Sequence, residues 1–160
     1  MFFSKSFGYA VRGVLYIALM HDEKRRVQTD EIAERLRVPK HFMGKILKKL
    51  AKENILSSVK GPYGGFSITE KTLSTSLSQL IEITNGGEIF NVCTLQMKEC
   101  NSLHPCPIHN KMESVKEQLI FFLSATTIAD LLRGNKNDFI KSISTDFLTN
   151  AGTKPKNRKG

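Results

Sequence analysis

The residues with the clearest chemistry in this sequence are three cysteines and a histidine within one short segment. Cys93, Cys100, Cys106 and His109 are separated by six, five and two residues, and the 160-residue chain has no other cysteine. Three thiolates and one imidazole provide the four ligands that zinc or an iron–sulfur centre requires. An odd, clustered set of cysteines is a poor disulfide framework, so the pattern indicates a reducing compartment and a metal site.

These residues alone leave three kinds of site open. An iron–sulfur cluster suits a thiolate-rich set, and a histidine ligand raises the reduction potential of such a cluster. A structural zinc site fits the number of ligands, although the Cys-x2-4-Cys knuckle usual in such sites is missing. The spacing of the four residues also approaches that of the Cys-Cys-Cys-His zinc fingers that bind RNA. Free redox-active thiols are the third kind. His104 competes as fourth ligand, but His109 is favoured because it would lie in the first turn of the following helix.

Charged residues are distributed unevenly along the chain. With 24 Lys and Arg against 15 Asp and Glu, the formal net charge is +9. Residues 1–71 carry 14 basic and 7 acidic side chains, a net charge of +7, and residues 151–160 carry four basic side chains and no acid. Residues 72–110 and 111–150 have net charges of −2 and 0. A polyanion contacted by the first part of the chain is the partner that this distribution indicates.

The composition predicts a soluble domain. A hydrophobic content of 40% supports a packed core and argues against disorder throughout. No run reaches the roughly 18 apolar residues of a membrane span. Arg12 interrupts the apolar N-terminal stretch and no small-residue cleavage site follows Met20, so no signal peptide is predicted. We therefore expect a cytoplasmic protein with no membrane partner.

Three helices are predicted in the basic first part of the chain. Apolar residues from Phe7 to Ala18 recur at helical spacing and indicate a core helix that ends near His21. Thr29, followed by two acidic residues, predicts the capped start of a short second helix. Pro39 is suited to open a third helix, which runs to about Glu53. Two helices joined by a brief turn form the helix-turn-helix arrangement.

The third helix has two different faces when its residues are projected at 100° intervals. The face predicted to be buried consists of Phe42, Met43, Ile46, Leu47 and Leu50. The opposite face consists of His41, Lys45, Lys48, Lys49 and Lys52. A lysine-rich face can simply be solvated. Four lysines in eight residues after a helix-turn-helix turn, with only Glu53 nearby to offset them, favour nucleic-acid binding.

The next segment, ILSSVKGPYGGFSIT, predicts a β-hairpin around a glycine-rich turn. Phe66 and Ile68 alternate with polar residues, as a strand with one buried face requires. A phosphate-binding loop is excluded because no Lys-Ser or Lys-Thr closes the pattern. A hairpin directly after a basic helix is expected to form a wing, with Lys60 and Tyr63 touching the DNA backbone or minor groove.

Further helices are predicted in the second half. One runs from Ser76 to Asn85 and ends at the two glycines that follow. A long helix begins at Pro107, and its apolar residues step by 4, 3, 4 and 3, which is typical of a coiled-coil seam. The seam residues are Ile108, Met112, Val115, Leu119 and Phe122. This seam predicts a dimer, although it can equally dock on its own domain. Thr127 and Asp130 predict a capped short helix ending at Gly134, and residues 138–148 another.

In these motifs the sequence resembles the winged-helix regulators of the IscR and NsrR type, the Rrf-two family. The resemblance covers nearly the whole chain, from SKSFGYAVRGVLYIAL through IAERLRVPKHFMGKILKKL and SSVKGPYGGF to the three cysteines and the ADLL helix. It implies a homodimer with paired long helices, a cluster in the preceding loop, and promoter binding controlled by the cluster. Carried over by position, the cluster ligands would be Cys93, Cys100, Cys106 and His109.

Two positions depart from the pattern of these regulators. Gly8 stands where some members carry an aspartate ligand, which favours the histidine-ligated 2Fe-2S form over a 4Fe-4S cluster. Gly44 stands where IscR-type members carry a glutamate that discriminates between DNA sites, so the operator preference is not carried over. The central cysteine interval also differs slightly, and the signal sensed is not carried over either.

The predicted fold is mainly α-helical with a small β-hairpin wing. We expect a winged helix-turn-helix DNA-binding domain in residues 1–87, a metal- or cluster-binding loop in 88–106, dimerisation helices in 107–148 and a disordered basic tail in 149–160.

The predicted function is that of a homodimeric transcriptional regulator whose binding to double-stranded DNA is controlled by an iron–sulfur cluster that senses redox state, iron or nitric oxide. The predicted DNA contacts are Lys40, His41, Lys45, Lys48, Lys49, Lys60 and Tyr63. The alternative is a zinc-stabilised or metal-free regulator that senses thiol oxidation directly. No carboxylate pair or Ser/His/Asp arrangement was found, so an enzyme is not expected.

Overall fold

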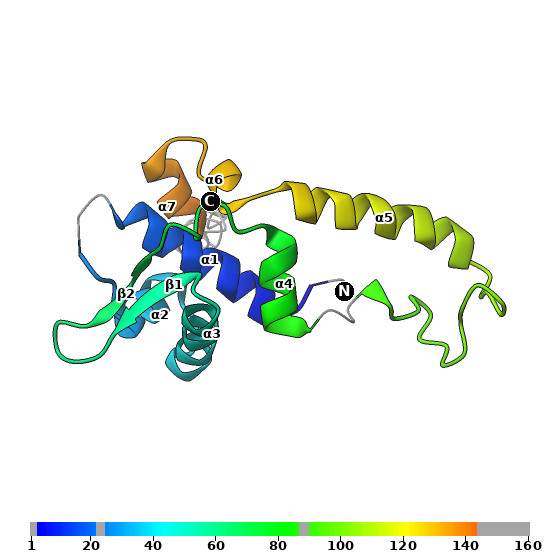
Figure 1. Cartoon of the computed structure of the whole chain (residues 1–160), viewed down its shortest axis with the longest axis horizontal. Helices are drawn as coiled ribbons and strands as arrows, with labels where there is room; N and C mark the ends of the chain where they lie inside the picture. Colours follow the sequence, from blue (N-terminus) through cyan, green and yellow to red (C-terminus); the bar gives the residue numbers. More distant parts are fainter. Residues whose placement is uncertain (1–2, 22–24, 87–89, 144–160) are drawn as a thin grey trace, which may run out of the picture.

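A helical body carrying a two-stranded hairpin, and a long helix that projects from it, make up the described part of the chain (Figure 1). The computed structural model describes residues 3–21, 25–86 and 90–143. Within these residues the elements are α1 (Lys5–Leu19), α2 (Thr29–Leu36), α3 (Lys40–Lys52), β1 (Leu56–Val59), β2 (Gly65–Ile68), α4 (Leu77–Asn85), α5 (His109–Ala125), α6 (Ile128–Leu131) and α7 (Lys136–Ile143). The mainly helical fold with one hairpin, expected from the sequence, is confirmed. None of the described helices combines the length and the apolar character needed to cross a membrane.

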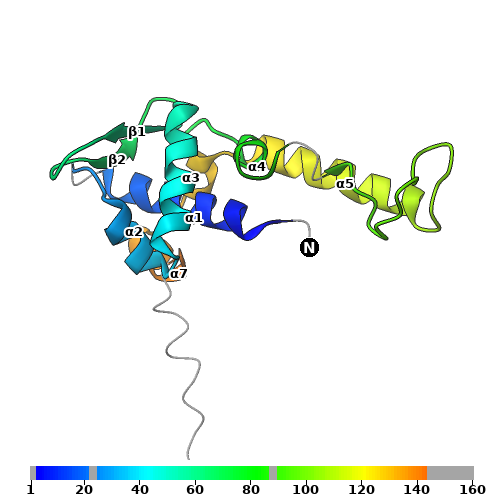
Figure 2. The ribbon, with the colours of Figure 1, turned by 90° about the horizontal axis from the view of Figure 1, so that it is seen from below.

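The core forms where α1 packs against α3 and α4. Ser4 caps α1 by accepting a hydrogen bond from the backbone N–H of Phe7, and Ala10, Val14 and Ile17 on the inner face are buried. α3 crosses α1 (Figure 2), and a Cβ placed on Gly13 would lie 3.3 Å from the Met43 sulfur. The glycine therefore allows the two helices to approach closely.

α2 and α3 form the expected helix-turn-helix. The turn uses a left-handed Arg37, and the N–H of Val38 donates to the Ala33 carbonyl at 2.9 Å. Pro39 occupies the N-cap position of α3, one residue earlier than the first helical position expected for it. The expected cap at Thr29 is wrong: Thr29 is the first residue of α2, Gln28 is its N-cap, and no side chain caps the helix.

One residue of the α3 apolar face is placed differently from the prediction. Met43, Ile46, Leu47 and Leu50 are buried, but the Phe42 side chain is 49% exposed, and its ring lies 4.2 Å from the His41 ring. The buried face of α3 is therefore narrower than the apolar face predicted from the sequence. The reason is that α1 packs over Met43 and Leu47 and leaves the edge of α3 that carries Phe42 uncovered.

β1 and β2 form the predicted antiparallel hairpin, in which Leu56 pairs with Ile68 and Val59 with Gly65. Val27 bridges to Phe66 through two backbone hydrogen bonds of 2.8 Å, which attach the hairpin to the segment before α2. A Cβ on Gly64 would lie 2.2 Å from the Val59 carbonyl oxygen. The turn therefore requires a residue without a side chain at position 64.

Gly64→Ala is expected to destabilise the fold by about 2 kcal/mol, because the new methyl group forces the backbone of the hairpin turn apart. The matched control is Gly8→Ala in α1, where nothing lies within 4 Å of an added Cβ. That change is expected to stabilise the helix by roughly 0.5–1 kcal/mol. Urea unfolding followed by circular dichroism measures both. Equal midpoints for the two variants would contradict the argument.

The starts of α4 and α6 are joined to each other. Ser76 and Gln79 form a capping box on α4, and Thr127 and Asp130 form one on α6, as the Thr127–Asp130 pair predicted. Ser76 and Thr127 make an isolated antiparallel bridge, and the Leu77 N–H donates to the Thr126 carbonyl at 2.9 Å. The chain therefore returns after α5 to the point from which it left before α4.

α5 is long, as expected, but it begins at His109 rather than at Pro107, with Ile108 as its N-cap. Leu123 is its buried residue, whereas Val115 and Phe122 of the predicted seam are 49% and 54% exposed and Phe121 is 75% exposed. The helix projects from the body in both ribbon views (Figures 1 and 2). Within the described residues, Val115 and Phe122 of the predicted seam are therefore exposed, whereas Met112 and Leu119 are half-buried and Leu119 packs against the core.

α7 returns to the body and packs on α1. Arg12 of α1 joins it to the helix-turn-helix: the guanidinium donates to the Ile143 carbonyl at 2.8 and 3.0 Å and to the Leu36 carbonyl at 2.7 Å. One side chain thus satisfies carbonyls at the ends of α2 and α7, where helices leave such groups unpaired. Residues 144–148 of the predicted last helix, and the predicted tail 149–160, lie outside the described residues.

Arg12→Met is expected to lower the free energy of unfolding by about 2 kcal/mol, because it leaves these two carbonyls without their charged donor. The melting temperature should fall by roughly 4–8 °C. Arg133→Met is the matched control, since its side chain is 81% exposed and pairs only with Asp130 in the described structure. If the Arg12 and Arg133 variants had the same melting temperature, the proposed role of Arg12 in linking the ends of α2 and α7 would be refuted.

Candidate metal centre and nucleic-acid interface

The three cysteines meet in the cysteine loop, defined as residues 90–108, which connects the end of α4 to the start of α5. Their sulfur atoms all lie within 4.8 Å of one another, although the residues are spread over fourteen positions. The Cys93 and Cys106 sulfurs are 3.8 Å apart. Cys106 is buried, and Cys93 and Cys100 are half-buried. The loop thus converts the sequence spacing into one compact set of soft donor atoms.

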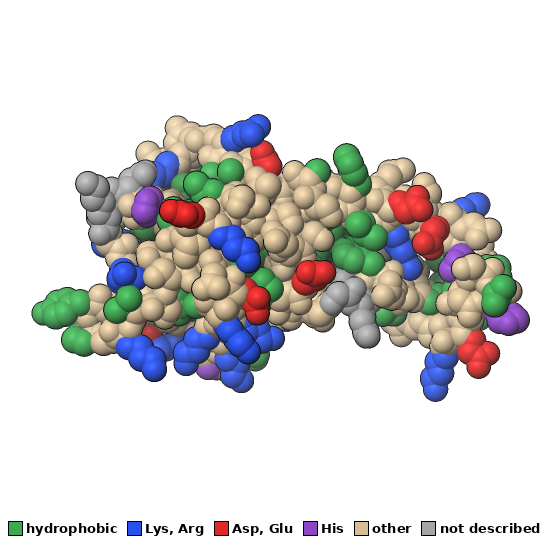
Figure 3. All heavy atoms as spheres, in the orientation of Figure 1, with side chains coloured by type: hydrophobic (Ala, Val, Ile, Leu, Met, Phe, Trp, Pro, Cys, Tyr) green, Lys and Arg blue, Asp and Glu red, His purple; other side chains and the backbone are tan. Residues whose placement is uncertain are grey.

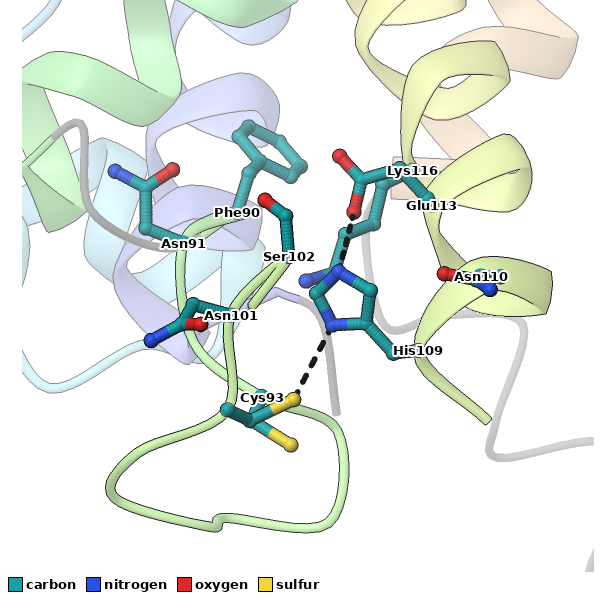
Figure 4. Close-up of a pocket in the computed structure, with 10 residues that line it drawn as sticks. Phe90, Asn91, Cys93, Asn101, Ser102, His109, Asn110, Glu113 and Lys116 are labelled. Carbon is teal, nitrogen blue, oxygen red and sulfur yellow. Dashed lines mark hydrogen bonds and ion pairs between the residues drawn. The ribbon is translucent and has the colours of Figure 1, made fainter. Parts of the chain in front are cut away.

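His109, the first residue of α5, faces this set. Its Nδ1 lies 3.2 Å from the Cys100 sulfur, and its Nε2 lies 3.8 Å from a carboxylate oxygen of Glu113 one turn along the helix. Figure 4 shows the ring between the sulfur atoms and Glu113. A carboxylate on the far nitrogen is a common way of orienting a ligating histidine. The exposed His104 makes no such contact within the described loop; its backbone N–H binds the Asn101 side chain.

The loop backbone affects two of the thiols differently. The N–H of Met97 hydrogen-bonds the Cys93 sulfur and, against the effect of burial, lowers the pKa of that thiol to about 7. The N–H of Cys106 lies 3.4 Å from the Cys100 sulfur and lowers the pKa of the Cys100 thiol. Burial and the neighbouring thiols outweigh this hydrogen bond, so the pKa of Cys100 is raised overall. Backbone donors directed at sulfur favour thiolates, the form that binds metal.

A pocket of about 450 Å³ opens beside the thiols. Its walls include Cys93 and Cys100 from the loop and His109, Glu113 and Lys116 from α5 (Figure 4). The Lys116 ammonium donates to the Val92 carbonyl at 3.2 Å and so ties α5 to the loop. Glu113 and Lys116 were not identified from the sequence; their positions four and seven residues after His109, on the same helix face, were the available signal.

Basic side chains gather over α3, along the lower edge of the molecule in the view of Figure 3. Lys45, Lys48 and Lys49 are exposed there, as expected. Lys40 is also exposed, but its ammonium pairs with an Asp30 carboxylate oxygen at 2.6 Å. The structure therefore brings the predicted α3 residues onto one surface and gives one of them an acidic partner that the sequence argument did not include.

The hairpin turn extends beyond the body and carries the other two predicted contacts. Lys60 is exposed, and Tyr63 is 95% exposed. The Gln28 amide donates to the Pro62 carbonyl at 2.9 Å, so the start of α2 holds the turn. Gln28 could not be identified from the sequence, because nothing in its type or spacing points to a partner 34 residues away. The two candidate surfaces lie on different parts of the molecule: the basic one on the body, the cysteine one at the loop.

Comparison with known proteins gives a consistent result. The family model Rrf2, described as iron-dependent transcriptional regulator, matches residues 3–134. An HTH-type transcriptional regulator of Aquifex aeolicus is 34% identical over 134 residues, covering 82% of this chain and 92% of that protein. The HTH-type transcriptional regulator IscR of Vibrio vulnificus is 26% identical over 129 residues, covering 80% of this chain and 75% of its own.

Solved structures support the same fold. The structure of IscR from T. potens aligns with a TM-score of 0.62 at 21% identity, covering 82% of this chain and 85% of that one. CymR of Staphylococcus aureus aligns with a TM-score of 0.65 at 16% identity, covering 82% and 98%.

Proposed function

The chain belongs to the Rrf2 family of transcriptional regulators, and we propose that it binds promoter DNA under the control of an iron–sulfur cluster. The family consists of regulators and not of enzymes, in agreement with the sequence. The proposed ligands are Cys93, Cys100, Cys106 and His109. The observation that carries the proposal is the convergence of three sulfurs within 4.8 Å, with an imidazole nitrogen 3.2 Å from one of them.

The donor set fits such a group. Thiolates are the usual ligands of iron–sulfur clusters, and a histidine in place of one thiolate is typical of a 2Fe-2S centre of raised potential. When bound, the cluster would supply a group whose charge and stability change with redox state, iron supply or nitric oxide. Within the chain, His109 begins α5 and Lys116 holds the loop backbone. Any change in the loop therefore acts directly on the start of α5.

α5 is the proposed dimerisation helix. Its exposed apolar residues Val115 and Phe122 lie seven residues apart on one face of the helix, and pairing with a second copy would cover that face. Two α3 helices in such a dimer would have to be about 34 Å apart to enter successive major grooves. Sedimentation equilibrium tests the association state.

The proposed DNA contacts are Lys40, His41, Lys45, Lys48, Lys49, Lys60 and Tyr63. The N-terminal part of α3 would contact base edges, and the later lysines would hold phosphates. The turn between β1 and β2 would contact the flank. The support is their shared exposure and the excess of positive charge in residues 1–71.

A second candidate is a zinc-stabilised or metal-free regulator that senses thiol oxidation. The 3.8 Å distance between the Cys93 and Cys106 sulfurs favours it, because an oxidant can join two thiols this close in a disulfide. Purification without oxygen distinguishes the two candidates. A coloured protein with visible absorption, iron and sulfide supports the cluster; a colourless protein, with or without stoichiometric zinc, contradicts it.

His109→Ala and His104→Ala form a matched pair for the fourth ligand. Removing the His109 imidazole is expected to weaken cluster retention roughly tenfold or more, as loss of ligand or ligand-orienting groups does at metal sites. His104→Ala should leave it unchanged, since that exposed ring makes no contact with the thiols in the described loop. Loss of visible absorption in air, followed over time, measures retention. Faster loss in His104→Ala than in His109→Ala would reverse the assignment.

A further inference from the structure

We propose that Cys93 and Cys106 form a reversible disulfide when the metal site is empty, and that this bond closes the site to metal. The bond itself depends only on this chain and a peroxide oxidant. Its regulatory role rests on the proposed function, because it acts by removing metal ligands.

The positions of the three thiols select this pair. The Cys93 and Cys106 sulfurs are in contact at 3.8 Å, so bond formation needs an approach of about 1.8 Å to reach the length of a disulfide. The segment between them has turns but no described helix or strand, so it can adjust. The Cys100 sulfur lies within 4.8 Å of both, but its contacts are with the Cys106 N–H at 3.4 Å and His109 Nδ1 at 3.2 Å.

Access to solvent gives the two thiols different roles. Cys93 lines the open pocket, whereas Cys106 is buried behind it and does not line it. A small oxidant such as hydrogen peroxide therefore reaches Cys93 before Cys106; Cys100 also lines the pocket, but its sulfur contacts His109 Nδ1 and the Cys106 N–H. Its sulfur attacks one peroxide oxygen and the O–O bond breaks, giving a sulfenic acid and water. The Cys106 sulfur then displaces the hydroxyl group as a second water. In total two thiols lose two electrons and two protons, and one peroxide becomes two waters.

The disulfide and the metal exclude each other. Two of the three thiolates would be consumed, leaving Cys100 and His109, which is too few to hold a four-ligand site. Peroxide would thus convert the empty site into a form that takes up neither iron nor zinc until a reductant restores it.

Peptide mapping of the full-length chain tests the bond. The protein is stripped of metal with a chelator and reductant, treated anaerobically with one equivalent of hydrogen peroxide, and alkylated. Trypsin cuts after Lys98 and chymotrypsin after Leu103, so the three cysteines fall in three peptides. We expect a Cys93–Cys106 linked pair, alkylated Cys100, and loss of the link with dithiothreitol. Cys100→Ser should keep the link, and Cys106→Ser should leave Cys93 unlinked and oxidised to the sulfenic acid.

A link through Cys100, or three alkylated thiols after peroxide, would overturn the inference. Metal uptake by the reduced, untreated protein is measured in parallel with Fe²⁺ and sulfide, and with Zn²⁺. Uptake without a Cys93–Cys106 link refutes the disulfide and leaves the proposed function standing. A Cys93–Cys106 link in a protein that takes up no metal refutes the proposed function and leaves the disulfide standing.

Discussion

Cys106→Ser is expected to abolish cluster assembly while leaving the body folded. Cys106 is the buried cysteine of the set, its sulfur contacts that of Cys93, and its backbone N–H contacts that of Cys100. A serine hydroxyl is a hard, weakly acidic donor and replaces a soft thiolate poorly. Iron and sulfide content and visible absorption should fall to background. Circular dichroism should retain its helical signal, because Cys106 is not part of the core cluster, to which Phe90 is the described loop's contribution.

Ser102→Ala is the control for this change. Ser102 lines the pocket beside Cys93 and Cys100 but lies outside the sulfur set, so its loss should leave iron content unaltered. A Cys106→Ser protein with full iron and sulfide would remove this residue from the ligands. On the functional side, a Cys93→Ala protein that bound every operator as the cluster-loaded protein does would contradict control by the cluster.

The double variant Lys45→Ala and Lys49→Ala is expected to weaken DNA binding roughly 50-fold at 0.1 M salt. Each phosphate contact contributes about 0.9 to the slope of log affinity against log salt concentration, so the slope should fall by about 2. Both side chains are exposed on α3 and lie one turn apart on its basic face. Fluorescence anisotropy with a promoter fragment over a salt series measures affinity and slope together.

The control removes the same charge from elsewhere. Lys98 in the cysteine loop and Lys141 in α7 are exposed and away from α3. Their double alanine variant has the same net charge as the α3 variant, so a general electrostatic attraction would weaken equally in both. An unchanged slope in the α3 variant would exclude these two lysines from the DNA interface.

The body of the fold was predictable because its signals are local. The helix-turn-helix follows from apolar spacing and Pro39, and the hairpin follows from its alternating residues and glycine turn. Phe42 was misassigned because helical spacing identifies an apolar arc but not how much of it a neighbouring helix covers. Arg12 was noted only as an interruption of an apolar stretch. Its partners, Leu36 and Ile143, lie 24 and 131 residues away, and no spacing rule reaches so far.

The grouping of the three cysteines was predictable from the sequence, but their arrangement was not. Cysteine and histidine types identify donor atoms, yet they do not say that Cys93 contacts Cys106 while Cys100 faces His109. The choice between His104 and His109 depended on where α5 begins, because only a residue in its first turn is held toward the loop. The structure favours His109 by proximity. The ligand roles themselves remain predictions for the experiments above.

The bridge between Ser76 and Thr127 fixes the point at which the chain returns to the body after the cysteine loop and α5. Backbone hydrogen bonds hold the residues just before α4 next to the residues just after α5. An insertion or deletion in the cysteine loop therefore changes how far the loop and α5 extend from the body, but not where the chain rejoins it. The number of residues between the cysteines can therefore change without moving α3 or the hairpin. The cysteine loop can therefore be exchanged for one of different length and chemistry, while the basic surface on α3 and the hairpin keep their shape.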